Sequence, residues 1–259
     1  MKYEHILNYA AEAGFTLCGV ARARVLAGHA PWFEAGLEAS GEGVLPYLAR
    51  EWRRRLDPST LLADARTVIV CALAYDGFSP VETDAGRVSA HRRNGDYHPG
   101  VKAMLREVSE RLRAENPPLR AKVCCDTSAI LEKAWAVEAG LGWQGRNTLL
   151  VNPMHGSFLL LGVIVLDAEC DRYDEPFSGV GCGSCRRCEE ACPTGALRDR
   201  TVDTGRCISA LTIERSRKGL PAEPINGWVS GCDECQTACP HNLRRVRLGA
   251  LPLPPRPFP

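Results

Sequence analysis

The sequence has no long apolar run and no excess of charge of one sign. Lys and Arg together number 32 and Asp and Glu number 31, so the total charge does not predict a strongly basic nucleic-acid-binding protein. The longest apolar candidate, 158–166, has the length of a strand and falls short of the roughly 18 residues of a membrane span. The first residues contain no basic stretch followed by an apolar one. We therefore expect a cytoplasmic protein that does not bind a membrane.

Cysteine, in contrast, is abundant and unevenly distributed. The chain has 13 cysteines in 259 residues, and eight of them fall between Cys182 and Cys239. An odd number of cysteines without an export signal argues against a disulfide framework. Dense cysteines at short, regular spacing in a reducing compartment indicate ligands of a metal or of an iron–sulfur cluster.

The spacing of these eight cysteines follows the run that bacterial ferredoxins use for [4Fe–4S] clusters. Cys182-x2-Cys185-x2-Cys188-x3-Cys192-Pro is a complete run, and the end of the run recurs near Cys239. In two-cluster ferredoxins the last cysteine of each run binds the other cluster. This rule predicts two clusters. The first is bound by Cys182, Cys185, Cys188 and Cys239. The second is bound by Cys192, Cys207, Cys232 and Cys235. The alternative is a pair of four-cysteine zinc sites, although zinc ribbons favour two separated C-x2-C pairs.

The residues before the cysteines predict a layered domain of helices and strands. Apolar runs predict strands at 15–21, 66–75, 122–125, 149–151 and 158–166, and helical spacing predicts helices at 3–14, 31–39, 101–116 and 127–140. The stretch 76–97 is expected to be a loop. This alternation is typical of an α/β or α+β fold. We predict a first domain over 1–167, a cluster domain over 168–247 and a proline-rich tail over 248–259.

Clusters transfer single electrons, so the first domain is expected to hold a substrate or an electron acceptor. The glycines of 140–145 match a dinucleotide fingerprint in letters only, because they follow a predicted helix. Asp126 ends a predicted strand and begins a predicted helix. One interpretation is a side chain facing a ligand at the end of a strand, and the other is a helix N-cap. The residues alone leave both interpretations open.

Several motifs, in one order, resemble the epoxyqueuosine reductases. They are RLDP at 55–58, DYH at 96–98, CDTS at 125–128, GLGWQGRNTLLV at 140–151, HGSFLLLG at 155–162, CISALTIE at 207–214 and GCDECQTACPHN at 231–242. The resemblance implies an α+β fold in which a nitroreductase-like cobalamin-binding domain precedes a bacterial-ferredoxin-like module. It also implies reductive removal of the epoxide oxygen from the modified wobble base of tRNA, with Asp126 as the proton donor.

The resemblance further implies residues that contact the corrinoid of cobalamin. In the first domain these are Arg55, Tyr97, Asp126 and Ser157. Beside the second cluster they are Ser209, Thr212, Cys232 and Asp233. For Ser209 and Thr212 the alternative is a solvated helix face. His98 is interpreted as a residue that does not bind cobalt.

The partners that the resemblance implies are tRNA carrying epoxyqueuosine in its anticodon stem-loop and an external electron donor such as ferredoxin or flavodoxin. We expect a monomer. Many family members continue into a helical-repeat domain, whereas this chain ends 20 residues after Cys239. Arg146, Arg244 and Arg245 are predicted to contact phosphates. Two alternatives are a corrinoid enzyme of the reductive dehalogenase type and an electron carrier with no substrate of its own.

Overall fold

The computed structural model describes residues 1–41, 45–217 and 223–247, without the side chains of 214–217 and 245–247. The predicted proline-rich tail lies outside the described residues. At the centre is a four-stranded sheet in the order β1 (Leu17–Arg22), β2 (Thr67–Ala74), β8 (Leu159–Leu166) and β5 (Ala121–Cys124). Each neighbouring pair of strands is antiparallel. The fold is therefore α+β, because an α/β fold has a mostly parallel sheet.

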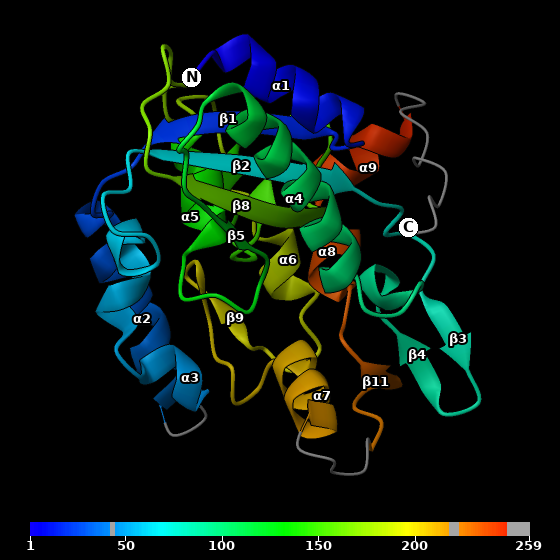
Figure 1. The fold of residues 1–259 in the computed structure, drawn as a ribbon. Helices are drawn as coiled ribbons and strands as arrows, with labels where there is room; N and C mark the ends of the chain where they lie inside the picture. Colours follow the sequence, from blue (N-terminus) through cyan, green and yellow to red (C-terminus); the bar gives the residue numbers. More distant parts are fainter. Residues whose placement is uncertain (42–44, 218–222, 248–259) are drawn as a thin grey trace.

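Helices cover both faces of this sheet (Figure 1). On one face α1 (Tyr3–Glu12) and α4 (His98–Glu115) pack through a core that includes Ile6, Leu105 and Ile164. On the other face α5 (Glu132–Glu138) packs through Trp135. Because both faces are covered, the central strands can be apolar on both sides, as the sequence TVIVCALA of β2 is.

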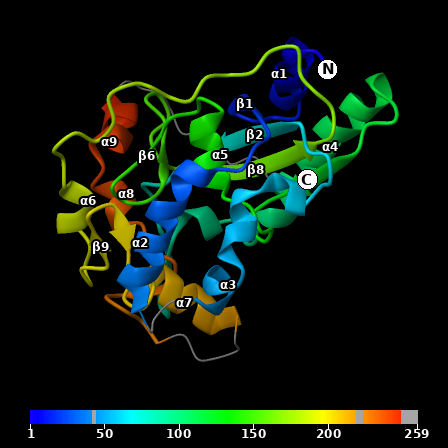
Figure 2. The same cartoon turned by 90° about the vertical axis from the view of Figure 1, so that its left-hand side faces the viewer.

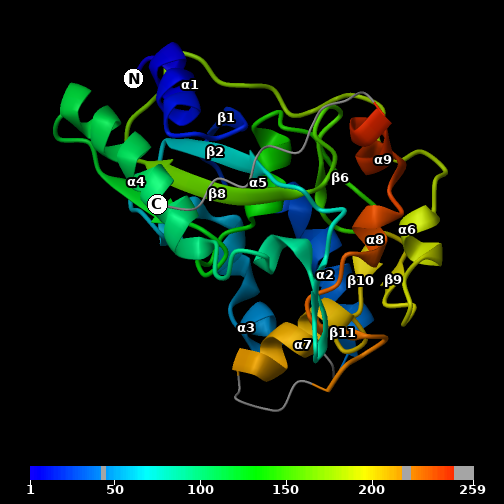
Figure 3. The same cartoon turned by 90° about the vertical axis from the view of Figure 1, so that its right-hand side faces the viewer.

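The cysteine-rich segment, defined here as residues 181–242, lies to one side of the sheet, away from α1 and α4 (Figures 2 and 3). It contains only short helices and strands. These are α6 (Arg187–Glu190), β9 (Leu197–Arg198), β10 (Thr201–Val202), α7 (Ile208–Arg217), β11 (Trp228–Ser230), α8 (Glu234–Thr237) and the start of α9 (Pro240–Arg247). The remaining elements are α2 (Ala30–Ser40), α3 (Pro46–Ala49), β6 (Trp143–Gln144), β7 (Leu150–Val151) and 3-10 turns at Ala27–His29, Trp52–Leu56, Pro58–Thr60 and Ala90–Arg92. No helix among the described residues is long and apolar enough to span a membrane.

The cysteine-rich segment is joined to the first half of the chain by a small sheet. The stretch 76–97, expected to be a loop, contains the hairpin β3 (Val81–Thr83) and β4 (Gly86–Val88). Strand β11 pairs with β4 in parallel, so residues 228–230 continue a sheet that begins at Val81. The prediction of a loop was wrong because this pairing joins residues that are distant in sequence. Residues on both sides of the predicted boundary at 167 thus share one sheet.

The predicted helix over 127–140 is also wrong at its start. Helix α5 begins at Glu132 with Leu131 as its N-cap, and residues 125–130 form a series of bends. Asp126 has a φ of 57°, a left-handed conformation that Asp and Asn tolerate better than most residues. Its backbone N–H donates to Glu132 Oε1 at 2.7 Å. Asp126 is therefore not a helix cap. Short polar side chains such as those of Asp126, Thr127 and Ser128 favour local turns over helix.

Candidate active site

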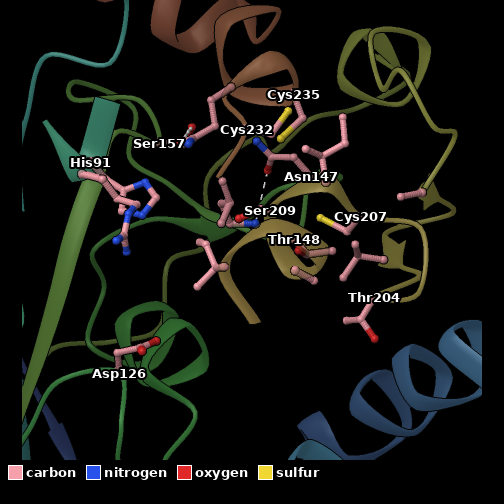
Figure 4. Close-up of a pocket in the computed structure, with 18 of the residues that line it drawn as sticks. His91, Asp126, Asn147, Thr148, Ser157, Thr204, Cys207, Ser209, Cys232 and Cys235 are labelled. Atoms are coloured by element: carbon pink, nitrogen blue, oxygen red, sulfur yellow. Dashed lines mark hydrogen bonds between the residues drawn. The ribbon is translucent and has the colours of Figure 1, made fainter. Parts of the chain in front are cut away.

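Two adjoining cavities lie beside the cysteine-rich segment, the larger between this segment and β8 and the smaller between this segment, α2 and the start of α5. Their volumes are about 540 and 450 Å³. Tyr47, Asp126, Lys133 and Thr148 line both cavities, so the two form a continuous space around Asp126. In Figure 4, Asp126 lies on one side of the larger cavity, and Cys232 and Cys235 lie across from it. An acid and a set of thiols thus face the same space.

The eight cysteines of the two ferredoxin-like runs form two groups in space. Cys192, Cys207, Cys232 and Cys235 line the larger cavity. Cys182, Cys185, Cys188 and Cys239 line a separate small cavity of about 20 Å³. The spatial groups are the same as those the crossed ferredoxin rule predicts, and their role as ligands stays a prediction.

The donor set suits cubane clusters. Four thiolates around a cubane each bind a different iron, so they stand apart around a central space. In the described parts of the chain, no three His, Cys, Asp or Glu side chains lie close enough to share one metal ion. Burial raises the pKa of Cys188 to about 11 and that of Cys232 to about 12. These thiols release protons only when a metal centre compensates the buried charge.

Asp126 forms a hydrogen-bonded pair with His98 at the start of α4. His98 Nε2 lies 3.1 Å from Asp126 Oδ2, and His98 Nδ1 contacts Asp96 Oδ1. The hydrogen bond with Asp126 raises the pKa of His98, and Asp96 adds to this effect against the opposing effect of burial. Both ring nitrogens are engaged with carboxylates, which agrees with the interpretation of His98 as a residue that does not bind cobalt.

A second histidine of the larger cavity has the opposite electrostatic environment. Burial lowers the pKa of His91 to about 4, and its Nδ1 lies 2.8 Å from Ser89 Oγ. The cavity therefore holds a neutral imidazole at His91 and an imidazole that favours its protonated form at His98. Neighbouring titratable groups whose pKa values are pushed apart are typical of acid–base sites.

Five of the residues proposed to contact a corrinoid, besides Asp126, line these cavities. They are Arg55, Tyr97, Ser157, Ser209 and Cys232. Two buried donor atoms in the cavity walls, Arg55 Nε and Asn147 Nδ2, have no hydrogen-bond partner among the described residues. A buried donor left unpaired costs about 1–3 kcal/mol, and a ligand rich in amide oxygens such as a corrinoid would satisfy it. The walls thus fit a corrinoid.

Thr212 and Asp233 do not belong to the lining of either cavity. Thr212 is 1% exposed; its hydroxyl donates to Ile208 O at 2.7 Å and accepts from the Gly231 N–H at 2.9 Å. Asp233 is also 1% exposed, and its Oδ2 accepts from the Ala90 N–H at 2.7 Å. Both side chains hold the loop that carries Cys232 in place. Neither residue lines a cavity, so their contact with a corrinoid stays a prediction that the cavity lining does not support. The alternative of a solvated helix face for Thr212 is wrong, because its side chain is buried.

Sequence reasoning missed His98 as the partner of Asp126, and it missed Lys133. Lys133 lines both cavities, and burial lowers the pKa of its ammonium group. A signal was present, because Glu132 and Lys133 interrupt the otherwise apolar stretch 129–137. The wrong helix start concealed it, since both residues then appeared to lie in the middle of a helix.

Two of the three arginines predicted to contact phosphates can be located. Arg146 is largely buried, with Nη1 3.4 Å from Glu189 Oε1, so this ion pair competes with a phosphate contact, which stays a prediction. Arg244 is exposed on α9. The side chain of Arg245 lies outside the described residues.

Two family models match the chain. One, described as "4Fe-4S double cluster binding domain", matches residues 181–242, and the other, described as "Epoxyqueuosine reductase QueG, DUF1730", matches residues 55–127. The chain therefore contains a double [4Fe–4S] cluster-binding segment. The cysteines above are those that this segment contributes.

Whole-chain likeness extends beyond these two segments. An epoxyqueuosine reductase of Cyclobacterium marinum is 36% identical over 241 residues, which are 90% of this chain and 76% of that protein. The solved structure of an epoxyqueuosine reductase with an epoxyqueuosine-modified tRNA-Tyr stem loop matches with a TM-score of 0.78 at 27% identity. The match covers 93% of this chain and 65% of the solved chain. A Bacillus subtilis epoxyqueuosine reductase, whose catalytic aspartate loop is swung out of the active site, has a TM-score of 0.75 and 27% identity, covering 92% and 64%. The chain thus spans about three quarters of this curated relative and just under two thirds of these solved chains.

A more distant likeness concerns the fold alone. The catabolic reductive dehalogenase NpRdhA matches with a TM-score of 0.61 at 19% identity, covering 95% of this chain and 33% of that protein. The sequence identity with the C. marinum protein, the matched family models and the shared fold all indicate the same family. This chain belongs to the epoxyqueuosine reductases.

Proposed function

We propose that this protein removes the epoxide oxygen from epoxyqueuosine at the wobble position of tRNA, with cobalamin and two [4Fe–4S] clusters as cofactors. The proposal depends above all on one observation, the cavity that Asp126 shares with Cys192, Cys207, Cys232 and Cys235. In this proposal residues 1–167 form the nitroreductase-like cobalamin-binding domain and 168–247 the ferredoxin-like module. The protein acts as a monomer in the cytoplasm.

The reaction needs both electrons and protons. Converting an epoxide to an alkene takes up two electrons and two protons and releases the oxygen as water. Cobalamin, when bound, supplies a metal centre that takes up electrons and acts on an epoxide carbon. The cysteines that would hold the second cluster line the same cavity, so electrons from that cluster would have a short path into it. The first cluster, bound by Cys182 and its group, receives electrons from an external donor such as ferredoxin or flavodoxin.

Asp126 is the proposed proton donor to the departing oxygen. Its carboxyl is hydrogen-bonded to His98, whose raised pKa keeps a proton available in the pair. As the C–O bond breaks, the proton held on His98 Nε2 passes to the Asp126 carboxylate and from Asp126 to the oxygen, and the second proton, which converts the resulting hydroxide to water, comes from solvent. A positioned acid of this kind typically contributes about 10²–10⁴-fold to a rate. The Bacillus subtilis relative, whose catalytic aspartate loop is swung out of the active site, supports a role for the loop 125–130.

The proposed corrinoid contacts are Arg55, Tyr97, Ser157, Ser209 and Cys232. Burial raises the pKa of Tyr97, so its phenol stays neutral, and its ring stacks on His98 with the centroids 4.2 Å apart. Ser157 has a fixed position, because its hydroxyl lies 3.1 Å from Gln236 Oε1 and accepts from Asn242 Nδ2 at 3.0 Å. These contacts hold the neutral polar groups of the wall in place around a bound corrinoid.

The tRNA is proposed to approach from the side of the exposed arginines. The relative solved with a modified stem loop supports a tRNA substrate. Arg50, Arg53 and Arg54 are exposed and flank cavity-lining residues Tyr47 and Arg55. Phosphate contacts of this kind position a nucleic acid without reading its sequence.

Incubation with a reductant and epoxyqueuosine-containing tRNA under anaerobic conditions, followed by nucleoside analysis, tests the function. Protein with both clusters and cobalamin should convert epoxyqueuosine to queuosine. Protein with clusters alone should not convert it. Full cofactor occupancy without any queuosine would contradict the proposal and favour another substrate.

A further inference from the structure

The first group of cysteines has an aromatic neighbour whose role the proposed function leaves open. Trp143 lies on β6 and donates its indole N–H to Cys182 Sγ at 3.4 Å. Only 8% of Trp143 is exposed, so the indole is buried beside this thiol. An N–H donor directed at a cluster thiolate affects the cluster's redox chemistry, because hydrogen bonds to the sulfurs help to set the reduction potential.

The indole is held in this position from several sides. The strand β6 that carries it pairs with β7 through Trp143 and Val151. The ring meets His241 edge-on, with centroids 4.8 Å apart, and Phe177 with centroids 5.4 Å apart. A Cβ at Gly181 would lie 3.2 Å from Trp143 Cδ1, so the chain next to Cys182 approaches the ring closely because residue 181 is glycine. These contacts hold the donor beside Cys182.

The sign of the effect follows from the charges. A reduced [4Fe–4S] cluster carries one more negative charge than the oxidised cluster, and hydrogen bonds to charged acceptors are about twice as strong as neutral ones. An N–H donor to a ligand sulfur therefore stabilises the reduced state more than the oxidised state. This shifts the reduction potential to a less negative value, which makes the cluster a better electron acceptor.

We propose that Trp143 is a positioning residue that raises the reduction potential of the first cluster through its N–H···S bond to Cys182. The first cluster then accepts an electron from the external donor more readily. In the second group, Cys192 Sγ accepts instead from the backbone N–H of Ala196 at 3.3 Å, a bond that no side-chain substitution removes. The inference rests on the proposed assignment of Cys182 to the first cluster.

Redox titration of the anaerobic, cluster-loaded protein, followed by EPR, tests the proposal with Trp143→Phe. Phenylalanine keeps an aromatic ring against His241 and removes the N–H. The potential of one cluster should become more negative, and that of the other should stay within error of wild type. The control is Trp135→Phe, which makes the same change in a fully buried indole of α5 whose Nε1 has no partner among the described residues. It should leave both potentials unchanged.

Unchanged potentials in Trp143→Phe with both clusters present would overturn the proposal. Wild-type protein that binds no clusters at all would instead contradict the proposed function, so the two failures can be told apart. If the variant loses a cluster, wild-type protein labelled with indole-15N tryptophan provides the test. Pulsed EPR of its reduced clusters should show a 15N coupling, and the absence of that coupling would equally refute the N–H···S bond.

Discussion

Replacing Asp126 by asparagine separates proton donation from the structural roles of this residue. Asparagine is close in shape, tolerates the φ of 57°, and its side-chain oxygen can accept from His98 Nε2 as the aspartate does. It has no acidic proton to give. Since the Asp126 side chain is about half exposed and does not cap a helix, the free energy of unfolding should change by no more than about 1 kcal/mol.

The expected loss of turnover is much larger. A missing general acid lowers the rate by about 10²–10⁴-fold. This corresponds to about 2.7–5.4 kcal/mol in the activation barrier, at 1.36 kcal/mol for each factor of ten. Asp126→Ala should lose turnover and also some stability, because alanine tolerates the left-handed conformation less well, at a cost of roughly 1–2 kcal/mol.

The assay is single-turnover deoxygenation of modified tRNA, with cluster and cobalamin content checked by spectrum. Asp57→Asn is the matched control. Asp57 is a carboxylate of the same half of the chain whose Oδ1 accepts the Ser59 N–H at 2.9 Å, and it should keep wild-type turnover. If Asp126→Asn is fully loaded and reacts at nearly the wild-type rate, the proton comes from water or another side chain and the reasoning is refuted.

Four further changes test other parts of the site. Cys192→Ser should damage the cluster of the second group, lowering iron from about eight to about four per chain; loss of the other cluster instead would contradict the crossed assignment. Asp96→Asn removes one of the carboxylates that raise the pKa of His98, so the alkaline limb of the kcat–pH profile should move to lower pH. The stabilisation that His98 gains from Asp126 and Asp96 is complete below the pKa of histidine in the unfolded chain, about 6.5, and is lost as the pH rises through the pKa of His98 in the folded protein. If the alkaline limb does not move, His98 takes no part in turnover. Thr212→Val removes two buried hydrogen bonds and should lower the free energy of unfolding by about 1–3 kcal/mol in denaturant titration. If the variant is as stable as wild type but binds cobalamin more weakly, Thr212 contacts the corrinoid after all. Arg50→Gln should reduce the salt slope of tRNA binding by about one unit, and an unchanged slope would place the tRNA elsewhere.

The parts of the molecule that the sequence predicts well are those with a local physical cause. Three cysteines within seven residues can only bind one small metal centre. The spacing alone therefore predicts that Cys182, Cys185 and Cys188 belong to the same group. The strands β2 and β8 were predicted within a residue or so at each end, because a run of about eight mostly apolar residues that includes β-branched ones is typical of a buried strand.

The parts that the sequence does not predict depend on contacts between distant residues. Residues 86–88 carry no local sign that 228–230 will pair with them. Ser209 and Thr212 are three apart on α7 and were expected to share a face. Yet Ser209 lines the larger cavity, whereas the buried Thr212 hydroxyl accepts a hydrogen bond from the Gly231 N–H. The packing of α7 against its neighbours decides which of the two side chains reaches the cavity. The pairing of His98 with Asp126 likewise depends on how α4 meets the loop after β5.

The parallel pairing of β4 with β11 has a consequence for how the enzyme matures in the cell. The cavity wall opposite Asp126 is built from Cys207, Cys232 and Cys235, and their loop is tied to residues 87–90 by that strand and by Asp233. The cysteines proposed to hold the second cluster are therefore also part of the wall of the pocket proposed for cobalamin, so a chain without that cluster should bind cobalamin poorly. Iron-starved cells would accumulate protein that lacks both cofactors, and feeding cobalamin alone would not restore queuosine in their tRNA.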